Sequence, residues 1–337
     1  MHKLLIHDVT LRDGSHAVGH QLTAGQVAAY AAAADKAGVP VVEVGHGNGL
    51  GASSLQVGES RLPDMEMIKV ARQNVTRSKL GIFIIPGFAT INKDLKPAIE
   101  AGADVVRVAA HCTEADITER HISYAREKGK DVYGVLMMTH MAPKETLAEE
   151  ALKMESYGAQ GVILMDSAGA YLQRDVTEKV SALVQALTIP VGFHAHNNLG
   201  LAVGNSVAAA EAGATIIDGS ARGFGAGAGN TPIELLIGVF EKMGFTTGVE
   251  LYKILDASDV AEKELMKLLP YPKPVSIVSG LAGVFSGFSK HVERVAKEYG
   301  VDPRDIFFEL GRRRVVGGQE DLIVEVAIEL SRKKELK

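Results

Sequence analysis

The chain contains a single cysteine and no apolar run of the length that a membrane span requires. Because Cys112 has no partner in the sequence, an intrachain disulfide is excluded, as is typical of proteins in the reducing cytoplasm. We expect its thiol to be buried in the core and not to act as a nucleophile. The apolar start of the chain is interrupted by His7 and Asp8 too early for a secretory signal. The sequence therefore predicts a soluble, cytoplasmic protein.

The chain also lacks an excess of basic residues. It has 36 Lys and Arg against 41 Asp and Glu, which gives a formal net charge of −5 at pH 7. A surface that binds nucleic acid without regard to its sequence is basic, so we expect no such partner. At 337 residues, 46% of them hydrophobic, the chain is long enough for a large barrel and an appended unit.

Eight short runs rich in β-branched residues alternate with longer helical patterns over most of the chain. Their near-continuous apolar character is typical of parallel strands that are buried on both faces. Eight regular β/α units favour a closed (β/α)8 TIM barrel, of the α/β class, over an open doubly wound sheet. The eight runs are Leu4–Leu11, Val39–Val44, Leu80–Ile85, Val105–Ala110, Val132–Met138, Val162–Met165, Val191–Ala195 and Thr215–Asp218.

The alternation ends after residue 258. Pro270, Pro272 and Pro274 predict a stiff connector, because the residue before each proline is pushed out of the α region. Only helical patterns follow, and an apolar stripe that includes Phe285 runs along the first of them. We predict a catalytic barrel over residues 1–262 and an all-helical C-terminal domain over residues 263–337. Its helices are expected at Ser276–Tyr299, Asp302–Arg313 and Gln319–Arg332.

Polar side chains follow seven of the eight predicted strands. Active sites of (β/α)8 barrels lie at the carboxyl ends of the strands, so this placement supports the barrel independently. The residues concerned are Arg12 and Asp13 after the first strand, Glu43 and His46 after the second, His111 after the fourth, His140 after the fifth, Asp166 and Ser167 after the sixth, His194 and His196 at the seventh, and Arg222 with the Gly223–Gly229 loop after the eighth.

His194 and His196 are two positions apart, so on a strand their side chains point to the same face. Alone, such a pair could equally be hydrogen-bonded core histidines. Asp13 at the end of the first strand favours a metal site, because one strand alone separates the first and seventh strands around a closed barrel. Two imidazoles and one carboxylate leave open coordination positions, which suits catalysis. We expect Mn²⁺ or Mg²⁺, with Co²⁺ or Zn²⁺ as alternatives, and a role for Asn197 or Asn198 in orienting a ligand.

Arg12 and His16 flank the metal carboxylate in the sequence. Arg12 could form a simple salt bridge to Asp13 or Glu43, or it could stabilise an oxyanion that develops beside the metal. His16 is well placed to act as a general base. His20 is expected only to line the same rim.

Two further features of the predicted rim allow more than one interpretation. Ser167 could donate to a substrate carboxylate or act as a helix N-cap. The Gly223–Gly229 loop fits a dinucleotide fingerprint only with Ala228 in the last place, and it closes a β/α unit instead of opening one. We expect these glycines to allow a close approach of the backbone to the ligand or to the helix that starts near Asn230.

Together these motifs resemble the metal-dependent barrel enzymes that include isopropylmalate synthases and 3-hydroxy-3-methylglutaryl-CoA lyases. The chain is most similar to the 4-hydroxy-2-oxovalerate aldolase family, and the resemblance covers nearly its whole length. It is carried by residues 8–17, Glu43–Gly47, Asp166–Gly169, His194–Asn197, Gly223–Asn230 and Val316–Asp321.

The resemblance implies a class II pyruvate aldolase, commonly Mn²⁺-dependent, of bacterial aromatic and sterol catabolism. Such an enzyme cleaves 4-hydroxy-2-oxovalerate, or longer 4-hydroxy-2-oxo acids, to pyruvate and an aldehyde. It passes the aldehyde through an internal channel to an acylating acetaldehyde dehydrogenase, which the C-terminal helices contact. By the same resemblance, Asp13, His194 and His196 are metal ligands, His16 is the base, and Arg12 and Ser167 bind substrate together with Asp13 and His194.

One position departs from the family. Many members have Tyr where this chain has Phe285, which cannot donate a hydrogen bond. Phe285 is assigned to the aldehyde pocket or channel, or it simply packs on its helix stripe. The proton donor to the enolate, the C4 stereochemistry, the aldehyde length, the physiological metal and the stoichiometry of the complex stay open.

Two other functions compete with the aldolase. An acetyl-CoA-dependent Claisen-type synthase usually carries a larger C-terminal region than the 75 residues predicted here, and a CoA-thioester lyase would have Cys in the glycine-rich loop. A catalytically silent subunit that organises a dehydrogenase would not need Arg12, Asp13 and His16 intact.

Overall fold

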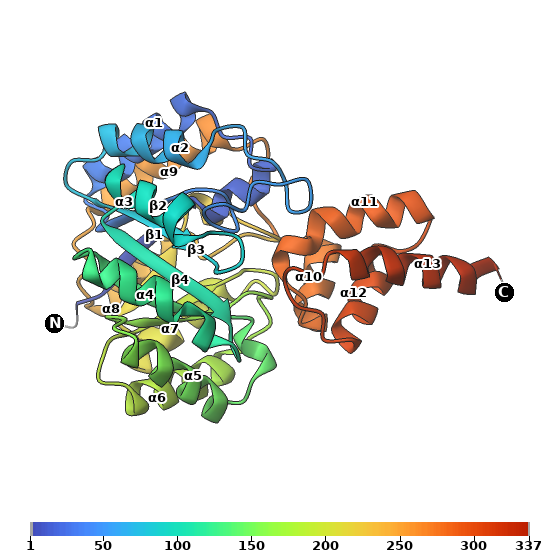
Figure 1. Ribbon diagram of the computed structural model, residues 1–337. Coiled ribbons are helices and arrows are strands. Elements are labelled where there is room, and N and C mark those ends of the chain that lie inside the picture. The colour runs from blue at the N-terminus through green and yellow to red at the C-terminus, as the bar shows by residue number, and fades with distance from the viewer. Residues whose placement is uncertain (1–2, 336–337) are drawn as a thin grey trace.

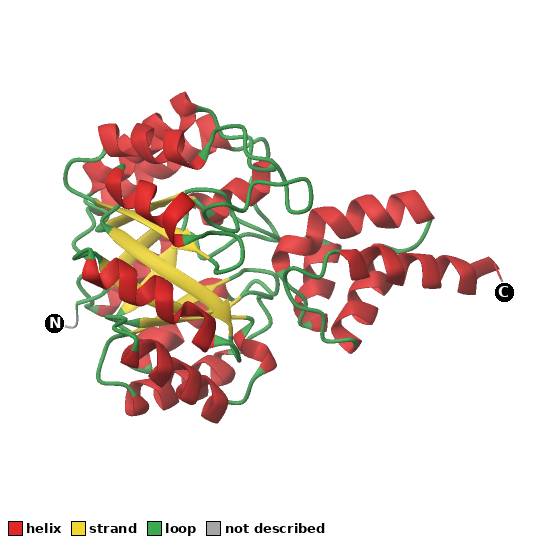
Figure 2. Cartoon of the chain, viewed as in Figure 1, coloured by secondary structure: helices red, strands yellow, loops and turns green. Residues whose placement is uncertain are grey.

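The computed structural model describes residues 3–335. Eight parallel strands close into a barrel in sequence order, which confirms the predicted fold class (Figures 1 and 2). Each strand begins and ends within two residues of its predicted run. The strands are β1 Leu5–Leu11, β2 Val41–Val44, β3 Lys79–Ile84, β4 Val105–His111, β5 Asp131–Met137, β6 Val162–Asp166, β7 Val191–Ala195 and β8 Ile216–Gly219.

Helices surround the barrel (Figure 2). They bury the outward-facing apolar side chains of the strands. The first shows how the sequence sets their ends, because Thr23 and Gln26 form a capping box at its start and Gly38 ends it in the left-handed conformation. These helices are α1 Ala24–Ala37, α2 Asp64–Asn74, α3 Lys96–Glu100, α4 Glu119–Glu127, α5 Lys144–Ser156, α6 Gln173–Ala186, α7 Ala202–Glu211, α8 Ile233–Met243 and α9 Leu251–Leu265.

The C-terminal helices form a separate core of their own. They extend from the end of the barrel toward which β4 points, the carboxyl end of the strands (Figure 1). Hydrogen bonds tie this unit to the loops there, such as Ser286 N–H to the Ser167 carbonyl at 3.0 Å. The helices are α10 Pro274–Ala282, α11 Ser289–Tyr299, α12 Pro303–Arg312 and α13 Asp321–Glu335.

The single helix predicted over Ser276–Tyr299 is wrong. Gly283 adopts the left-handed conformation, with φ +65°, and ends α10 by donating its N–H to backbone carbonyls of the last turn. A short 3-10 turn, Ser286–Phe288, then leads into α11. Phe285 therefore lies in the connection between two helices and not on a continuous helical stripe.

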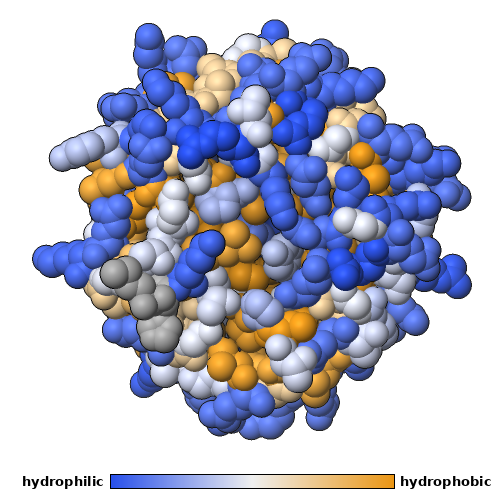
Figure 3. Space-filling view, turned by 90° about the vertical axis from the view of Figure 1, so that its left-hand side faces the viewer, coloured by the Kyte–Doolittle hydropathy of each residue, from blue (hydrophilic) through white to orange (hydrophobic). Residues whose placement is uncertain are grey.

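The division into a barrel over residues 1–262 and a helical domain over residues 263–337 stays a proposal. The last barrel helix, α9, packs on α1 and α8 and ends at Leu265. Figure 3 shows the opposite end of the barrel, where apolar side chains gather toward the middle and hydrophilic ones surround them. Within residues 3–335, no helix has the length and apolar character to cross a membrane.

Candidate metal centre and active site

The three predicted metal ligands meet at the carboxyl end of the barrel. Asp13 begins a 3-10 turn, η1 (Asp13–Val18), directly after β1, while His194 lies on β7 and His196 follows it. One potential ligand atom from each lies within 4.8 Å of the other two, and all three residues are buried. The Nε2 atoms of the two histidines are 3.4 Å apart. The prediction that distant segments bring these side chains together is confirmed.

The donor set fits a divalent cation. The Nδ1 atom of His194 is 2.9 Å from a carboxylate oxygen of Asp218, so its Nε2 atom is left to face the other ligands. Burial lowers the pKa of His196 to about 4, which keeps this imidazole in the neutral form that binds metals. Its Nδ1 atom is buried without a hydrogen-bond partner among the described residues. One carboxylate and two imidazoles are suitable ligands for Mn²⁺, Mg²⁺ or Co²⁺.

Asp13 is held from both sides. Its Oδ1 atom accepts hydrogen bonds from the Asn230 amide at 3.0 Å and from the Ala226 N–H at 3.2 Å, and its Oδ2 atom accepts one from Arg12 at 2.9 Å. Burial alone would raise the pKa of Asp13, but its electrostatic interactions with the ring of His196 and the guanidinium of Arg12 hold it well below its usual value. The carboxylate is therefore ionised and fixed in place.

A network of buried charges connects Arg12 with His194 across the barrel interior. The Nε atom of Arg12 donates to Glu43 at 2.5 Å, and the other carboxylate oxygen of Glu43 accepts from Arg107 at 3.1 Å. Arg107 also donates to Asp218 at 2.6 Å. All four charged residues of this network, Arg12, Glu43, Arg107 and Asp218, are at most 2% exposed. Because each charge has a partner, the network holds both the guanidinium of Arg12 and the ring of His194 in fixed positions.

The first of the two roles predicted for Arg12, a salt bridge to a neighbouring carboxylate, is confirmed. It forms the predicted salt bridges to Asp13 and to Glu43. Its remaining nitrogen, NH2, is buried without a hydrogen-bond partner among the described residues. A buried donor without a partner is costly, so this atom is available to a substrate oxygen beside Asp13.

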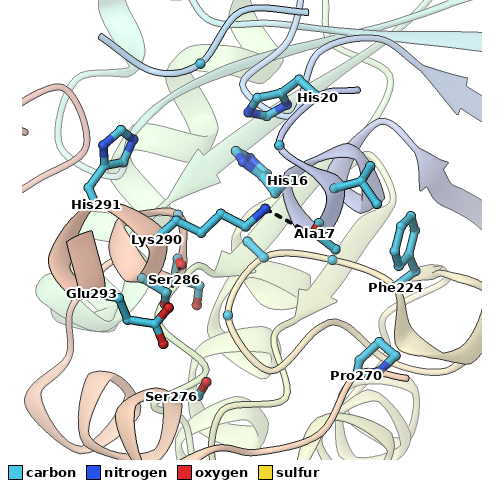
Figure 4. A pocket seen from close by; sticks show the side chains of 18 of the residues that line it. His16, Ala17, His20, Phe224, Pro270, Ser276, Ser286, Lys290, His291 and Glu293 are labelled. Carbon is cyan, nitrogen blue, oxygen red and sulfur yellow. Dashed lines mark hydrogen bonds between the residues drawn. The ribbon is translucent and has the colours of Figure 1, made fainter. Parts of the chain in front are cut away.

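His16 lies on the 3-10 turn η1 and lines a cavity of about 540 Å³ between the barrel mouth and the C-terminal helices (Figure 4). Its ring forms a T-shaped pair with the ring of His20, which in turn stacks on His46 at a centroid distance of 3.6 Å. Burial lowers the pKa of His16 to about 3, which leaves its imidazole neutral at physiological pH. His20 lines the same cavity, as predicted.

Ser167 is fully buried directly after β6. The interpretation of this residue as a helix N-cap is wrong, because α6 begins at Gln173 and its N-cap is Leu172. The Ser167 hydroxyl instead accepts a hydrogen bond from the Met138 N–H at 2.9 Å. As an acceptor in that bond, the hydroxyl keeps its own proton for donation.

The predicted roles of Asn197 and Asn198 need correction. Asn197 accepts the Ala202 N–H at the start of α7, and Asn198 donates to the Ala168 carbonyl and to the Ser286 hydroxyl. Neither contacts His194 or His196 through these bonds, so they organise loops and do not orient a ligand. Asp218 orients His194, as described above.

The glycine-rich loop approaches the metal centre closely, as predicted. A Cβ atom at Gly225 would lie 2.7 Å from Asp13 Oδ1 and 2.4 Å from the Asn230 amide nitrogen. Such contacts are too short for any larger residue, so glycine lets the loop reach the ligand.

Three other polar residues predicted at strand ends lie outside the metal centre. His111 and His140 line separate cavities, and Arg222 pairs with Glu234 and with residues of α9. Cys112 is buried, as predicted, and burial raises the pKa of its thiol to about 12, which disfavours the nucleophilic thiolate.

Sequence reasoning missed Arg107, Asp218 and Asn230. Arg107 and Asp218 lie inside apolar strands. A charged residue is unusual there, and this feature of the sequence could have indicated that both have a special role. Asn230 ends the glycine-rich loop, and only the three-dimensional contact with Asp13 reveals its role.

Comparison with known proteins finds family matches for both parts of the chain. Residues 3–261 match the HMGL-like family, and residues 270–332 match the DmpG-like communication domain. The 4-hydroxy-2-oxovalerate aldolase of Spirochaeta aurantia is 63% identical over 327 residues, which cover 97% of this chain and 96% of that protein. The chain belongs to the 4-hydroxy-2-oxovalerate aldolase family. A second member of this family of carbon–carbon lyases, from Pectobacterium atrosepticum, is 60% identical over 99% of this chain and 97% of its own length.

The fold recurs in more distant proteins. The carboxyl transferase domain of Rhizobium etli pyruvate carboxylase superposes with a TM-score of 0.83 at 16% identity, over 99% of this chain and 61% of that one. At this identity the likeness concerns the fold alone.

Proposed function

We propose that the protein is a divalent-metal-dependent aldolase that cleaves 4-hydroxy-2-oxovalerate to pyruvate and acetaldehyde. Longer 4-hydroxy-2-oxo acids are included as substrates. One observation carries the proposal: Asp13, His194 and His196 form a metal-type cluster beside the unpartnered NH2 atom of Arg12. The names of the closely similar relatives agree with this reaction.

In this proposal, each residue of the site has a separate role in the cleavage reaction. A divalent ion bound by Asp13, His194 and His196 would supply polarisation of the C2 carbonyl. His16 accepts the proton of the C4 hydroxyl, whose electrons form the aldehyde carbonyl as the C3–C4 bond breaks. The electron pair of that bond moves toward C2 and leaves the enolate of pyruvate, and Arg12 stabilises its oxygen.

Ser167 completes the substrate contacts in this proposal. Its hydroxyl proton would be donated to the substrate carboxylate. The short bond from Arg12 to Glu43 directs the guanidinium, so that its charge is in place before the enolate forms. We propose Mn²⁺ as the ion, with Mg²⁺ or Co²⁺ as alternatives, because oxygen and imidazole donors suit all three.

Phe285 is proposed to lie where the aldehyde leaves the site. It lines both the cavity that contains His16 and a second cavity of about 280 Å³. The second cavity has mostly apolar walls, among them Ile85, Phe88 and Met137. A neutral aldehyde suits such walls better than an anionic acid does. Because Phe285 has no hydroxyl, another group must return a proton to the enolate.

An acylating acetaldehyde dehydrogenase is the proposed partner and the acceptor of the aldehyde. The match of residues 270–332 to a communication domain supports contact through the C-terminal helices. Three large apolar side chains on α10 and α12 are exposed there, namely Ile277, Leu281 and Phe308, with exposed fractions of 39%, 63% and 51%. Exposed apolar side chains of this kind are typical of protein interfaces. We place the reaction in cytoplasmic catabolism of aromatic compounds or sterols.

The test uses the full chain reconstituted with Mn²⁺. With 4-hydroxy-2-oxovalerate it should release pyruvate and acetaldehyde in equal amounts, and a series of longer substrates defines the aldehyde pocket. The same protein is then given acetyl-CoA and a 2-oxo acid. Release of free CoA without cleavage of the hydroxy acid would instead establish the Claisen-type synthase. Turnover of neither substrate by the folded, metal-loaded chain would favour the silent subunit.

A further inference from the structure

The cavity that contains His16 has a basic wall. Most of that wall comes from the connector after α9 and from α11, and Figure 4 shows Lys290 extending from α11 toward the η1 turn. Four cationic side chains line the cavity against two carboxylates, a surplus of two positive charges in a chain whose net charge is −5. The cations are Lys267, Lys273, Lys290 and Arg294, and the carboxylates are Glu293 and Glu320.

Lys290 connects the basic wall with η1, the turn that carries His16. Its Nζ atom donates to the carbonyl oxygen of Ala17 at 3.0 Å, one residue after His16 (Figure 4). Burial lowers the pKa of Lys290, the carboxylate of Glu293 raises it, and the charges of Lys267 and Lys273 lower it again. Lys267 and Lys273 therefore repel the ammonium group of Lys290 in spite of Glu293, and an arriving anion would relieve this repulsion.

We propose that this cavity is the access route of the anionic 2-oxo acid, and that Lys267, Lys273 and Lys290 attract its carboxylate toward the metal centre. The inference rests on the proposed function and adds the route by which the substrate arrives. A cleft lined by charges of one sign raises the local concentration of an oppositely charged ligand and its association rate. The apolar cavity beyond Phe285 has no comparable set of cations, so the acid and the aldehyde would use different walls of the site.

The decisive variant is Lys267→Glu/Lys273→Glu, because neither lysine contacts the η1 turn through a hydrogen bond in the described structure. The matched control is Lys128→Glu/Lys242→Glu, which makes the same change in net charge at the C-terminal ends of α4 and α8. Both are assayed for pyruvate release with Mn²⁺ from low to high ionic strength. At low salt we expect the cavity variant to lose roughly tenfold in kcat/KM with kcat changed less than twofold. The control should stay within twofold of the wild type.

Salt dependence separates attraction from a local structural change. The kcat/KM of the wild type should fall as the salt concentration rises. In the cavity variant, kcat/KM should depend less on salt or should rise with it. Binding of pyruvate to the Mn²⁺-loaded proteins, measured by calorimetry, should weaken in parallel. Lys267→Gln/Lys273→Gln provides a milder pair with the same expected direction, in case the reversal of charge prevents folding.

Equal kcat/KM values and equal salt slopes in the cavity and control variants would overturn the access route. That result would leave the aldolase proposal standing, because wild-type turnover is measured in the same experiment. No pyruvate release by the wild type would overturn both proposals together.

Discussion

From the contact between Asp218 and His194 we predict that Asp218 strengthens the binding of the metal ion. The Asp218 carboxylate accepts from Arg107 at 2.6 Å and lies 2.9 Å from His194 Nδ1. It favours the tautomer with the proton on Nδ1, which leaves the Nε2 lone pair for the metal. In Asp218→Asn the new amide presents N–H groups as well as an oxygen, so both the tautomer and the pairing with Arg107 are disturbed.

We expect this substitution to weaken Mn²⁺ binding ten- to 100-fold, since groups that orient a metal-binding histidine typically have effects of this size. This corresponds to about 1.4 to 2.7 kcal/mol. The unfolding free energy should fall by about 3 kcal/mol, because Arg107 loses one of its two buried counter-charges. With saturating metal, kcat should recover much more than the affinity does.

The assay is titration of the metal-free protein with Mn²⁺, followed by the electron paramagnetic resonance signal of the free ion. Asp35→Asn is the matched control. Asp35 is also a buried carboxylate, but it accepts from Thr76, Arg77 and Ser78 at the other end of the barrel. The control should lose stability and keep its Mn²⁺ affinity. If Asp218→Asn binds Mn²⁺ as tightly as the control does, the orienting role of Asp218 is refuted.

Three further predictions concern the ligand, the base and a buried acid. His194→Ala should abolish stoichiometric Mn²⁺ binding, whereas His16→Ala should keep it and lower kcat at least 100-fold; equal loss of metal in both would contradict the assigned roles. Gly47→Ala should lower kcat without changing Mn²⁺ affinity, because a Cβ atom there would lie 2.4 Å from the His16 ring; an unchanged kcat would show that the ring moves aside freely. Burial raises the pKa of Asp8 to about 6 in the folded protein. Between about pH 4 and pH 6 the folded protein therefore holds a proton on Asp8 that the unfolded chain has lost, and the contribution of Asp8 to the unfolding free energy falls as the pH rises through this range. Urea unfolding of metal-free wild type and Asp8→Asn should therefore diverge over that range by up to about 3 kcal/mol, in favour of the variant at higher pH; parallel curves would contradict the shifted pKa.

Much of the site could be predicted from the sequence because it depends on local periodicity. His194 and His196 are two positions apart at the end of one strand, and Asp13 follows the end of another, so the barrel geometry alone brings them to one rim. The same logic failed for Gly283, because an isolated glycine within an apolar helical pattern is often tolerated. Its left-handed conformation ends the helix, and its carbonyl oxygen lies 2.8 Å from the His140 Nε2 atom of the barrel, a contact between distant segments that local periodicity does not reveal.

The buried charge network could not be predicted, for a different reason. Arg107 and Asp218 come from β4 and β8, which are four strands apart around the barrel. Their contact depends on which side chains fill the barrel interior and how far each one reaches. A charged residue within an apolar strand signals that a partner is needed, but the sequence does not identify that partner.

The central claim is that the centre formed by Asp13, His194 and His196 cleaves a 4-hydroxy-2-oxo acid only when it holds a divalent ion. The most direct measurement is a time course of pyruvate release from 4-hydroxy-2-oxovalerate by the metal-free chain, before and after one equivalent of Mn²⁺ is added. We predict no release before the addition and rapid release after it, with His196→Ala inactive throughout. Release at the same rate without metal, or no release when one Mn²⁺ is bound per folded chain, would contradict the claim.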